Sequence, residues 1–455
     1  MKIDILVAEI GSTTTVVNAF NNIDTQPIFL GQGQANTTVE EGDVNIGLVK
    51  AIDNLTKKLS IETIQYKDLL ATSSAAGGLR MSVHGLVYDM TVRAAREAAL
   101  GAGANIHLVT TGKLRKSDLK KIKEIKPNII LIAGGVDYGE RDTSLHNAEM
   151  IGELNLDIPI IYAGNIENHQ DIKDIFANEN TDLYIVDNVY PKIDELNVGP
   201  TRKVIQEVFE KHIIHAQGME NVGKMVSGSI MPTPGAVMEA SELLYNDLGD
   251  LVTIDVGGAT TDIHSVTEDS DEISRILLHP EPKSKRSVEG DLGVYINIGN
   301  IIDIIGKEKL AQDLGITLSD VEKLISNHKP IPGTNLEKNF VEIMTLHAAI
   351  TAIKRHGGKL KDIYGPSGKK TIAEGKDLTQ VKYIIGTGGA LTKLSEGGSS
   401  ILKSIPHSNK GNELLPNTEV KILLDKDYIM ASLGVMAKKY PEVALKLLKS
   451  SLKEE

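Results

Sequence analysis

Two short turns, far apart in the chain, each join a carboxylate at the end of an apolar run to a cluster of small and hydroxyl-bearing residues. The candidate phosphate-binding residues are Gly11, Ser12, Thr13 and Thr14 in the first turn, and Gly257, Gly258, Ala259 and Thr260 in the second. Glycine lets backbone N–H groups approach a phosphate closely, and hydroxyls add donors. Magnesium bound to phosphate takes one or two carboxylates, so Glu9 and Asp255 are the candidate metal ligands.

A third glycine-rich turn ends an apolar run late in the chain, and its residues are Gly386, Thr387, Gly388 and Gly389. Such a turn would let a flat base and its ribose lie against the backbone. Asp262 is a candidate to orient or activate a hydrolytic water, which makes Asp255 and Asp262 the candidate catalytic carboxylates. The chain has no Walker A pattern, which excludes a P-loop, and no G-x-G-x-x-G turn after its first strand, which argues against a dinucleotide-binding site.

Each turn alone is explained equally well as an ordinary β-hairpin that uses glycine to reverse the chain. A second pattern favours a shared site. The spacing from Gly11 to Gly257 is close to that from Gly134 to Gly388, and Gly134 also follows an apolar run. The matched spacing predicts one fold used twice, with a cleft between the halves.

Short apolar runs alternate with helical patterns, which predicts an α/β fold with mostly parallel strands after an N-terminal hairpin. Strands are expected at 3–10, 15–20, 106–110, 129–133, 158–163 and 183–186, and helices at 44–59, 90–100, 117–125 and 143–154. The helix at 44–59 should pack through Ile46, Val49, Ile52 and Leu55. Glycines and prolines at 217–234 predict a boundary. Residues 1–216 would form a first half with insertions, and 217–455 a second half with a helical insertion at about 297–356. Residues 359–370 are expected to form a polar loop.

The 455 residues include no cysteine, which excludes disulfides, thiolate zinc sites, cysteine nucleophiles and cysteine-bound iron–sulfur clusters. A net charge of −12 and an aromatic content of 4% argue against a nucleic-acid partner. No apolar run is long enough to span a membrane, and the N-terminal run is interpreted as a strand rather than a signal peptide. We therefore expect a cytoplasmic protein with no membrane contact.

Three basic features each leave two interpretations open. The run from Lys113 to Lys126 holds seven basic residues, which form either a solvated helix face or a surface for an acidic partner. Arg80 and Arg286 lie beside glycine-rich stretches. They are interpreted either as contacts to a nucleotide or partner, or as structural residues.

At the three glycine turns the sequence resembles the actin-like ATPase superfamily, which includes actin, heat-shock chaperone ATPases, and sugar and acetate kinases. Residues 255–262 resemble its second phosphate motif, 11–15 its first, and 386–390 its adenosine motif, while the segments after Pro234 and Tyr428 resemble its connecting helices. The resemblance implies a duplicated actin-like (ribonuclease H-like) fold around a nucleotide cleft, with ATP and magnesium as cofactors. The first motif usually opens with aspartate, so Glu9 implies metal contact through water.

A narrower resemblance is carried by residues 6–20, 71–80 (ATSSAAGGLR), 133–137 and 286–293 (RSVEGDLG). These stretches resemble the accessory proteins of adenosylcobalamin-dependent mutases, the glutamate mutase accessory family often labelled MutL. The resemblance implies a slow ATPase that acts as a chaperone and releases damaged cobalamin from a mutase of the glutamate mutase or ornithine aminomutase type. Related activators of hydroxyacyl-CoA dehydratases carry a cysteine-bound iron–sulfur cluster, which this chain cannot hold.

Two other functions stay open at this point. A small-molecule kinase of the same superfamily would need a general base near the γ-phosphate, for which Asp262 and Asp142 are candidates. A scaffold that binds nucleotide without turnover is the third possibility. Because unrelated activities share this fold, the fold alone does not separate them.

Overall fold

The computed structural model describes residues 2–11, 14–38, 42–74, 79–177, 181–213, 219, 222–227, 230–366, 368–394 and 397–454. The chain forms two compact units. Unit 1 comprises Met1–Glu239 and Ala431–Leu447, and unit 2 comprises Ala240–Met430 and Leu448–Glu455. The chain passes from one unit to the other within α8 (Thr233–Leu248), at the start of α16 (Met430–Ala437) and within α17 (Pro441–Ser451).

The first sheet of unit 1 is built on the N-terminal hairpin. In spatial order its strands are β10 (Ile230–Pro232), β4 (Gln65–Ser73), β1 (Lys2–Ile10), β2 (Thr14–Asn21) and β3 (Ile28–Asn36). β1 pairs antiparallel with β2 and parallel with β4, so it is a central strand. Its apolar run is buried on both faces, as a central strand requires. The predicted hairpin is confirmed.

Between β4 and β10 the chain builds a second sheet, which we call the inserted sheet. Its order is β6 (Asn105–Thr111), β5 (Arg80–Gly85), β7 (Ile129–Ile132), β8 (Ile160–Tyr162) and β9 (Leu183–Ile185), with all strands parallel. The helical segments in and after it are η1 (Tyr88–Val92), α2 (Arg93–Gly101), α3 (Lys116–Ile125), α4 (Asp142–Gly152), η2 (Ile166–Asn168), α5 (His169–Phe176), α6 (Val198–Ile213) and α7 (Val222–Met225). This alternation is the predicted parallel α/β pattern.

Unit 2 contains a six-stranded sheet in the order β13 (Ser284–Glu289), β12 (Thr261–Val266), β11 (Leu251–Val256), β16 (Tyr383–Thr387), β17 (Lys421–Asp425) and β18 (Leu452–Glu454). Its helices are α9 (Asp271–Ser274), α10 (Ile298–Ile305), α11 (Lys307–Leu314), α12 (Leu318–Ser326), α13 (Asn335–His356), α14 (Gly389–Thr392) and α15 (Gly397–His407). The buried side of α13 packs with the sheet in one apolar core, which positions β11 and β12 from one face.

The first sheet of unit 1 and the large sheet of unit 2 repeat one arrangement. In each, the first strand pairs antiparallel with the second and parallel with a later strand. Glu9 on β1 lies in register with Thr72 on β4, and Asp255 on β11 lies in register with Thr387 on β16. The two candidate metal-binding carboxylates therefore occupy the same place in two equivalent sheets. This duplication confirms the predicted actin-like α/β fold class.

The register also corrects part of the predicted repeat. β16 corresponds to β4, because each is the parallel neighbour of a hairpin strand. Gly134 instead follows β7, which belongs to the inserted sheet. The match between Gly134 and Gly388 is therefore wrong. Buried parallel strands often end in small residues wherever the chain must turn sharply, so two glycine pairs at strand ends were not evidence of equivalence.

Helix α1 (Val44–Lys58) forms where the sequence predicts it. Of the four residues predicted to pack, Leu55 is buried and Ile52 is partly buried against the core, but the other two face outward. Its buried residues include Val44, Leu48 and Leu55, whereas Ile46 and Val49 are 40% and 43% exposed. The buried set follows i, i+4 and i+7 spacing, which places one continuous stripe on the sheet. The apolar content of the segment was sufficient to predict a helix, but several apolar stripes competed to be its buried face.

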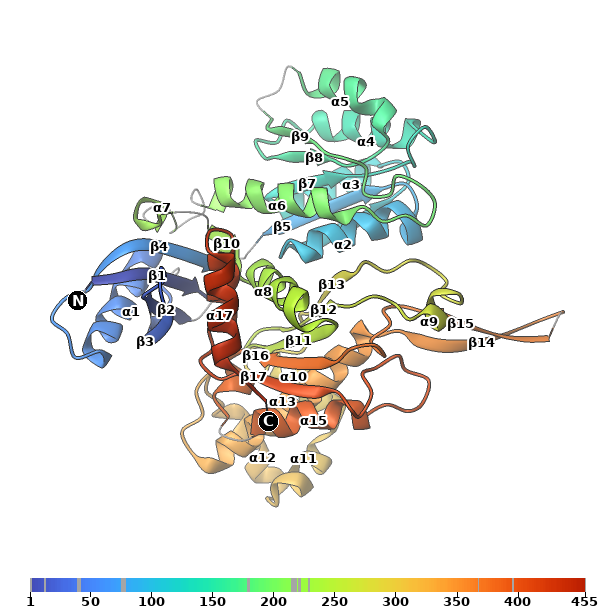
Figure 1. Cartoon of the computed structure of the whole chain (residues 1–455). Helices are drawn as coiled ribbons and strands as arrows, with labels where there is room; N and C mark the ends of the chain where they lie inside the picture. The colour runs from blue at the N-terminus through green and yellow to red at the C-terminus, as the bar shows by residue number, and fades with distance from the viewer. Residues whose placement is uncertain are drawn as a thin grey trace. The chain divides into compact units, whose positions relative to one another are not determined.

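Residues predicted as a polar loop form a β-hairpin, β14 (Lys359–Gly365) and β15 (Gly368–Glu374). It extends as a long arm at the right of Figure 1. Most of its residues are exposed, including Tyr364 at 79%. Two bridges at its base, to Leu277 and Glu413, anchor it. Because the strands bury little, the alternation of apolar and polar residues that signals a strand is absent.

Unit 1 is completed by residues from near the C-terminus. The amide of Asn18 on β2 donates a buried hydrogen bond of 2.8 Å to the Ser432 hydroxyl on α16. Gly434 packs so closely on α8 that an added Cβ would lie 1.8 Å from the Ala236 carbonyl oxygen. Only glycine permits this approach of two backbones. Across the residues described, no helix is long and apolar enough to cross a membrane.

Candidate functional site

The turn between β11 and β12 is the best-defined candidate site. Its backbone is closed by a hydrogen bond of 2.9 Å from the Gly257 N–H to the Thr260 carbonyl. A Cβ on Gly257 would lie 3.2 Å from that carbonyl oxygen, so the residue is suited to the tight closure. The sheet places Asp255 directly opposite Asp262 across this hairpin.

A loop after β13 binds the carbonyl groups of this turn. The Val294 N–H donates to the Gly257 carbonyl at 3.2 Å, and the N–H groups of Tyr295 and Ile296 both donate to the Gly258 carbonyl at 2.8 Å. The Asn297 side-chain amide completes the set, donating at 3.0 Å to the Ala259 carbonyl. The three successive carbonyls are thus occupied within the protein.

The N–H groups of the same turn are in the opposite situation. Those of Gly258, Ala259 and Thr260 have no hydrogen-bond acceptor among the described residues, and Gly258 is exposed. A turn with occupied acceptors and available donors favours an anion over a cation. The half-buried Asp255 carboxylate lies at the end of β11, next to this turn. This donor set fits a polyphosphate, with Asp255 as a carboxylate for an accompanying magnesium ion.

Asp262 is engaged by the protein through both carboxylate oxygens. Arg286 donates to Oδ1 through Nε at 3.0 Å and through a terminal nitrogen at 2.6 Å. The Thr260 hydroxyl donates to Oδ2 at 2.9 Å. Arg286 and Asp262 are only 1% and 6% exposed, so this is a buried ion pair. The arrangement supports the structural interpretation of Arg286 and ties the end of the turn to β13.

The stretch 286–293 (RSVEGDLG) braces the turn at several points. Besides Arg286, it supplies Gly293, where an added Cβ would lie 2.3 Å from the main chain of Ala259. Arg355, at the end of α13, donates to Glu289 at 2.7 Å and to Asp291 at 2.8 Å. Burial raises the pKa of Glu289 despite this cation, whereas the hydrogen bond from Arg355 lowers the pKa of Asp291.

The third turn, at the end of β16, divides into residues that pack internally and residues that meet the site. A Cβ on Gly386 would lie 2.6 Å from Leu402 Cδ1, so this glycine serves core packing. Gly388 has a φ of +87°, and a Cβ there would lie 2.4 Å from Asp255 Oδ1. At Gly389 a Cβ would meet nothing within 4 Å. Gly388 therefore brings the third turn against the candidate metal-binding carboxylate.

Thr387 leads to Asp425, a residue that the sequence analysis did not identify. The Thr387 hydroxyl, 2% exposed, donates to Asp425 at 2.9 Å. The same carboxylate accepts from the backbone of Ile429 and Met430 and from the Ser451 hydroxyl. Asp425 thus stabilises the first turn of α16. The sequence signal that could have identified Asp425 is an acidic residue at the end of a strand, just before a predicted helix. No comparable sequence signal pointed to Arg355 or Asn297.

The first hairpin has the same closure as the second. The Gly11 N–H donates to the Thr14 carbonyl at 3.0 Å, and the Thr37 hydroxyl donates to the Gly11 carbonyl at 2.8 Å. Glu9 is 8% exposed on β1. Ser12 and Thr13 lie outside the described residues. That both hairpins bind one triphosphate stays a prediction.

The remaining candidates lie in or beside the inserted sheet. Arg80 begins β5, and its N–H and Nε both donate to Asn128, at 3.0 and 3.4 Å. Asp142 is the first residue of α4. The contacts of Arg80 support the structural interpretation of this residue.

Two solved structures align with almost the whole chain, at low sequence identity. One is acetone carboxylase in its nucleotide-free form, with 12% identity, a TM-score of 0.42, and coverage of 96% of this chain and 70% of that chain. The other is the diol dehydratase-reactivating factor in nucleotide-free form, with 10% identity, a TM-score of 0.39, and coverage of 97% and 100%.

Sequence comparison is far more specific. The chain is 36% identical over 459 residues to Protein MutL from Clostridium tetanomorphum, with 98% of each chain covered. Residues 5–452 match the family described as MutL protein. This match spans both hairpins, the inserted sheet and the loop that braces the second turn. The chain is therefore a member of the MutL protein family.

Proposed function

We propose that this chain is an ATP-dependent reactivating factor for an adenosylcobalamin-dependent mutase of the glutamate mutase type. In this proposal ATP hydrolysis drives the release of damaged cobalamin, so that intact cofactor rebinds. The observation that carries the nucleotide part is the turn at 257–260: its carbonyls are occupied, whereas the N–H groups of Gly258, Ala259 and Thr260 lack acceptors within the described residues. The resemblance of the 71–80 and 286–293 stretches to mutase accessory proteins supports the partner.

The residues that would hold magnesium and ATP have distinct tasks. The N–H groups of Gly258, Ala259 and Thr260 would bind phosphate oxygens, and Asp255 would bind magnesium directly or through water. Gly388 and Gly389 would leave room for the adenosine. When bound, the nucleotide supplies the phosphoryl group that is transferred to water.

Asp262 would act as a positioning residue in this scheme. Because Arg286 and Thr260 occupy its two oxygens, it would hold the turn in place rather than remove a proton from water. Nucleotide hydrolysis would alter the protein's affinity for the mutase only if the nucleotide-bound and product-bound forms bind the mutase differently. The predicted slow, mutase-stimulated ATPase follows from that coupling.

The proposal is tested by reactivation. Glutamate mutase inactivated by damaged cobalamin is incubated with the chain, magnesium-ATP and free adenosylcobalamin, and substrate turnover is then measured. Turnover should return with ATP and stay absent with a non-hydrolysable analogue. Failure to bind magnesium-ATP, or hydrolysis without any return of turnover, would contradict the proposal. A phosphorylated product in a parallel screen of sugars and short carboxylic acids would instead favour the kinase.

Replacing Gly388 by alanine should lower nucleotide affinity at least tenfold. The new Cβ would lie 2.4 Å from Asp255 Oδ1 and 2.5 Å from the Val256 carbonyl oxygen, so the carboxylate and the third turn must separate. Affinity is measured by isothermal titration calorimetry with magnesium-ATP. With a φ of +87° and a ψ of 148°, Gly388 has a backbone conformation that other residues rarely adopt, so alanine adds roughly 1–3 kcal/mol of backbone strain.

Gly306→Ala is the matched control for that strain. Gly306 has a φ of +86°, and a Cβ there would meet nothing within 4 Å. This variant should lose only the stability that the backbone strain costs, and it should keep its nucleotide affinity. Equal affinities for Gly388→Ala and the native chain would show that the third turn does not contribute to the site.

A further inference from the structure

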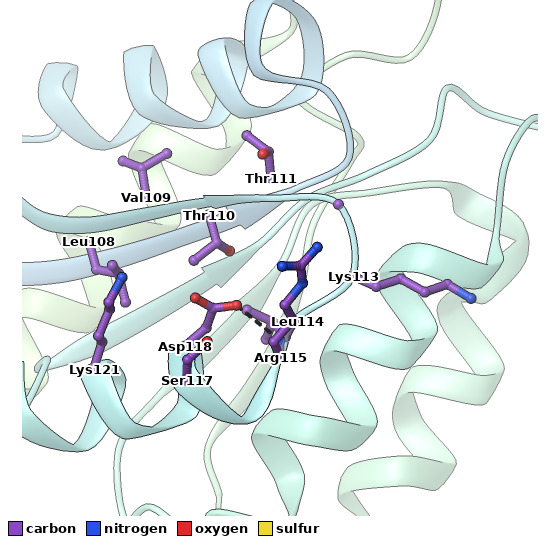
Figure 2. A pocket seen from close by; sticks show the side chains of 11 residues that line it. Leu108, Val109, Thr110, Thr111, Lys113, Leu114, Arg115, Ser117, Asp118 and Lys121 are labelled. Atoms are coloured by element: carbon purple, nitrogen blue, oxygen red, sulfur yellow. Dashed lines mark hydrogen bonds between the residues drawn. The ribbon is translucent and has the colours of Figure 1, made fainter.

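A cavity of about 650 Å³ lies between strand β6 of the inserted sheet and helix α3. Four successive strand residues, Leu108 to Thr111, line it together with Gly112–Arg115, Ser117, Asp118 and Lys121. Figure 2 shows Leu108 and Thr110 on the side of the strand that faces α3, and Val109 and Thr111 on the other side. Since side chains alternate along a strand, a cavity that meets four in succession must also border the main chain.

β6 is the edge strand of the inserted sheet. It pairs with β5 on one side, and within the described residues no strand pairs with its other side. An unpaired edge presents a row of N–H and C=O groups that a further extended segment can bind. The cavity thus borders the part of the inserted sheet that is open to strand addition.

The walls of this cavity belong to a basic surface that the chain does not neutralise. Seven basic residues, all exposed, lie between 113 and 126. Among the described residues the one ion pair in this run joins Lys120 to Glu124. Three of the others, Lys113, Arg115 and Lys121, line the cavity. In a chain with net charge −12, an unneutralised basic group of this size favours an acidic ligand.

We propose that β6 and α3 form a docking groove for an extended acidic segment of a partner protein. The segment would pair its main chain with the free edge of β6 and place carboxylates beside Lys113, Arg115 and Lys121. Apolar residues at alternate positions would meet Leu108 and Leu114. This proposal goes beyond the proposed function, because it requires neither nucleotide nor cobalamin.

An extended segment fits these observations better than a compact anion. A phosphate or small dianion would need donors converging on one point, whereas here Lys113 and Arg115 lie in the connection after β6 and Lys121 lies further along, on α3. Asp118 also lines the cavity, and its carboxylate accepts from the Arg115 N–H at 3.0 Å. A segment with alternating acidic and apolar residues meets both the charged and the apolar parts of the groove.

The test uses a fluorescein-labelled nine-residue peptide that alternates glutamate and valine, with the full-length chain and fluorescence anisotropy. Binding should saturate and should weaken as salt is raised. Two matched peptides separate charge from strand pairing. A glutamine–valine peptide should bind at least tenfold more weakly, and so should a glutamate–valine peptide N-methylated at alternate residues, which keeps its charge but loses main-chain donors.

Two double variants test the place of binding. Arg115→Glu with Lys121→Glu changes residues that line the groove and should weaken binding at least tenfold. Lys116→Glu with Lys123→Glu makes the same charge change on the same segment outside the lining, and should weaken it less than threefold. Circular dichroism checks that α3 is retained in both.

Several outcomes would overturn the proposal. Equal binding of the N-methylated peptide would mean that charge alone attracts the ligand. Equal losses in the two double variants would remove the groove as the site. Competition by a nine-nucleotide single-stranded RNA at the same concentration would point to polyanion binding of another class. The nucleotide and reactivation assays are unaffected by each of these results, so the two proposals fail independently.

Discussion

Lowering the pH from 7 to 5 should destabilise this protein by about 4 kcal/mol through two buried histidines alone, about 2 kcal/mol for each, and a third buried histidine acts in the same direction. Burial lowers the pKa of His84 to about 4 and that of His264 to about 3, and it holds the pKa of His356 well below its usual value. All three are almost fully buried. His84 and His264 therefore remain neutral in the folded chain near pH 5.

The sign follows from counting protons. In the unfolded chain these histidines have a pKa near 6.5 and become protonated as the pH falls below it. The unfolded state then binds more protons than the folded state, so stability decreases as pH decreases. Carboxyl groups whose pKa is raised by burial, Asp269, Glu289 and Asp427, act in the opposite direction, because the folded state binds their protons more readily than the unfolded state does.

The measurement is urea unfolding at a series of pH values, compared with the variant His264→Leu. Neither ring nitrogen of His264 has a hydrogen-bond partner among the described residues, so leucine removes a titrating group without breaking a bond. The variant should lose about 2 kcal/mol less than the native chain between pH 7 and 5. An unchanged pH dependence would mean that His264 is protonated in the folded state.

Replacing Arg286 by methionine should cost about 3–5 kcal/mol of unfolding free energy. The Asp262 carboxylate would stay buried at 6% exposure and lose both of its bonds to the guanidinium. An uncompensated buried charge is among the few changes with so large an effect. The turn at 257–260 should also loosen, since Thr260 depends on the same carboxylate.

A double-mutant cycle checks this result by urea unfolding at pH 7. Asp262→Leu added to Arg286→Met removes the stranded charge and should recover most of the lost stability. Arg275→Met, at an exposed arginine at the end of α9, should change stability by less than about 0.5 kcal/mol. Additive losses in the double variant would show that the pair contributes little coupling.

Much of the architecture followed from local sequence patterns. The N-terminal hairpin and the parallel strands were predictable because buried strands form short apolar runs bounded by turn residues. The acidic residues at strand ends before glycine turns could also be identified from the sequence. In the structure two of them, Glu9 and Asp255, occupy equivalent positions in the two sheets. These are short-range patterns, so they persist in a single sequence.

What could not be predicted depends on long-range contacts. Nothing near Asp425 in the sequence indicates that it binds Thr387 and Ser451, because those partners lie in other strands and helices. The interpretation of Asp262 changed for the same reason, since its partner Arg286 lies on the neighbouring strand. The arm at β14–β15 was missed because strands that bury few residues lack a periodic pattern of apolar and polar side chains.

The completion of unit 1 by residues 431–447 has a consequence for biosynthesis. The ribosome synthesises the N-terminal sheet long before it reaches Ser432 and Gly434. Until then the amide of Asn18 lacks its hydrogen-bond partner, and the face of α8 that Gly434 covers stays open to solvent. During translation the nascent N-terminal unit therefore lacks α16 and most of α17 until residues 431–447 have been made. A message truncated after β17 would yield an N-terminal unit without α16 and α17, in which the Asn18 amide lacks its Ser432 partner.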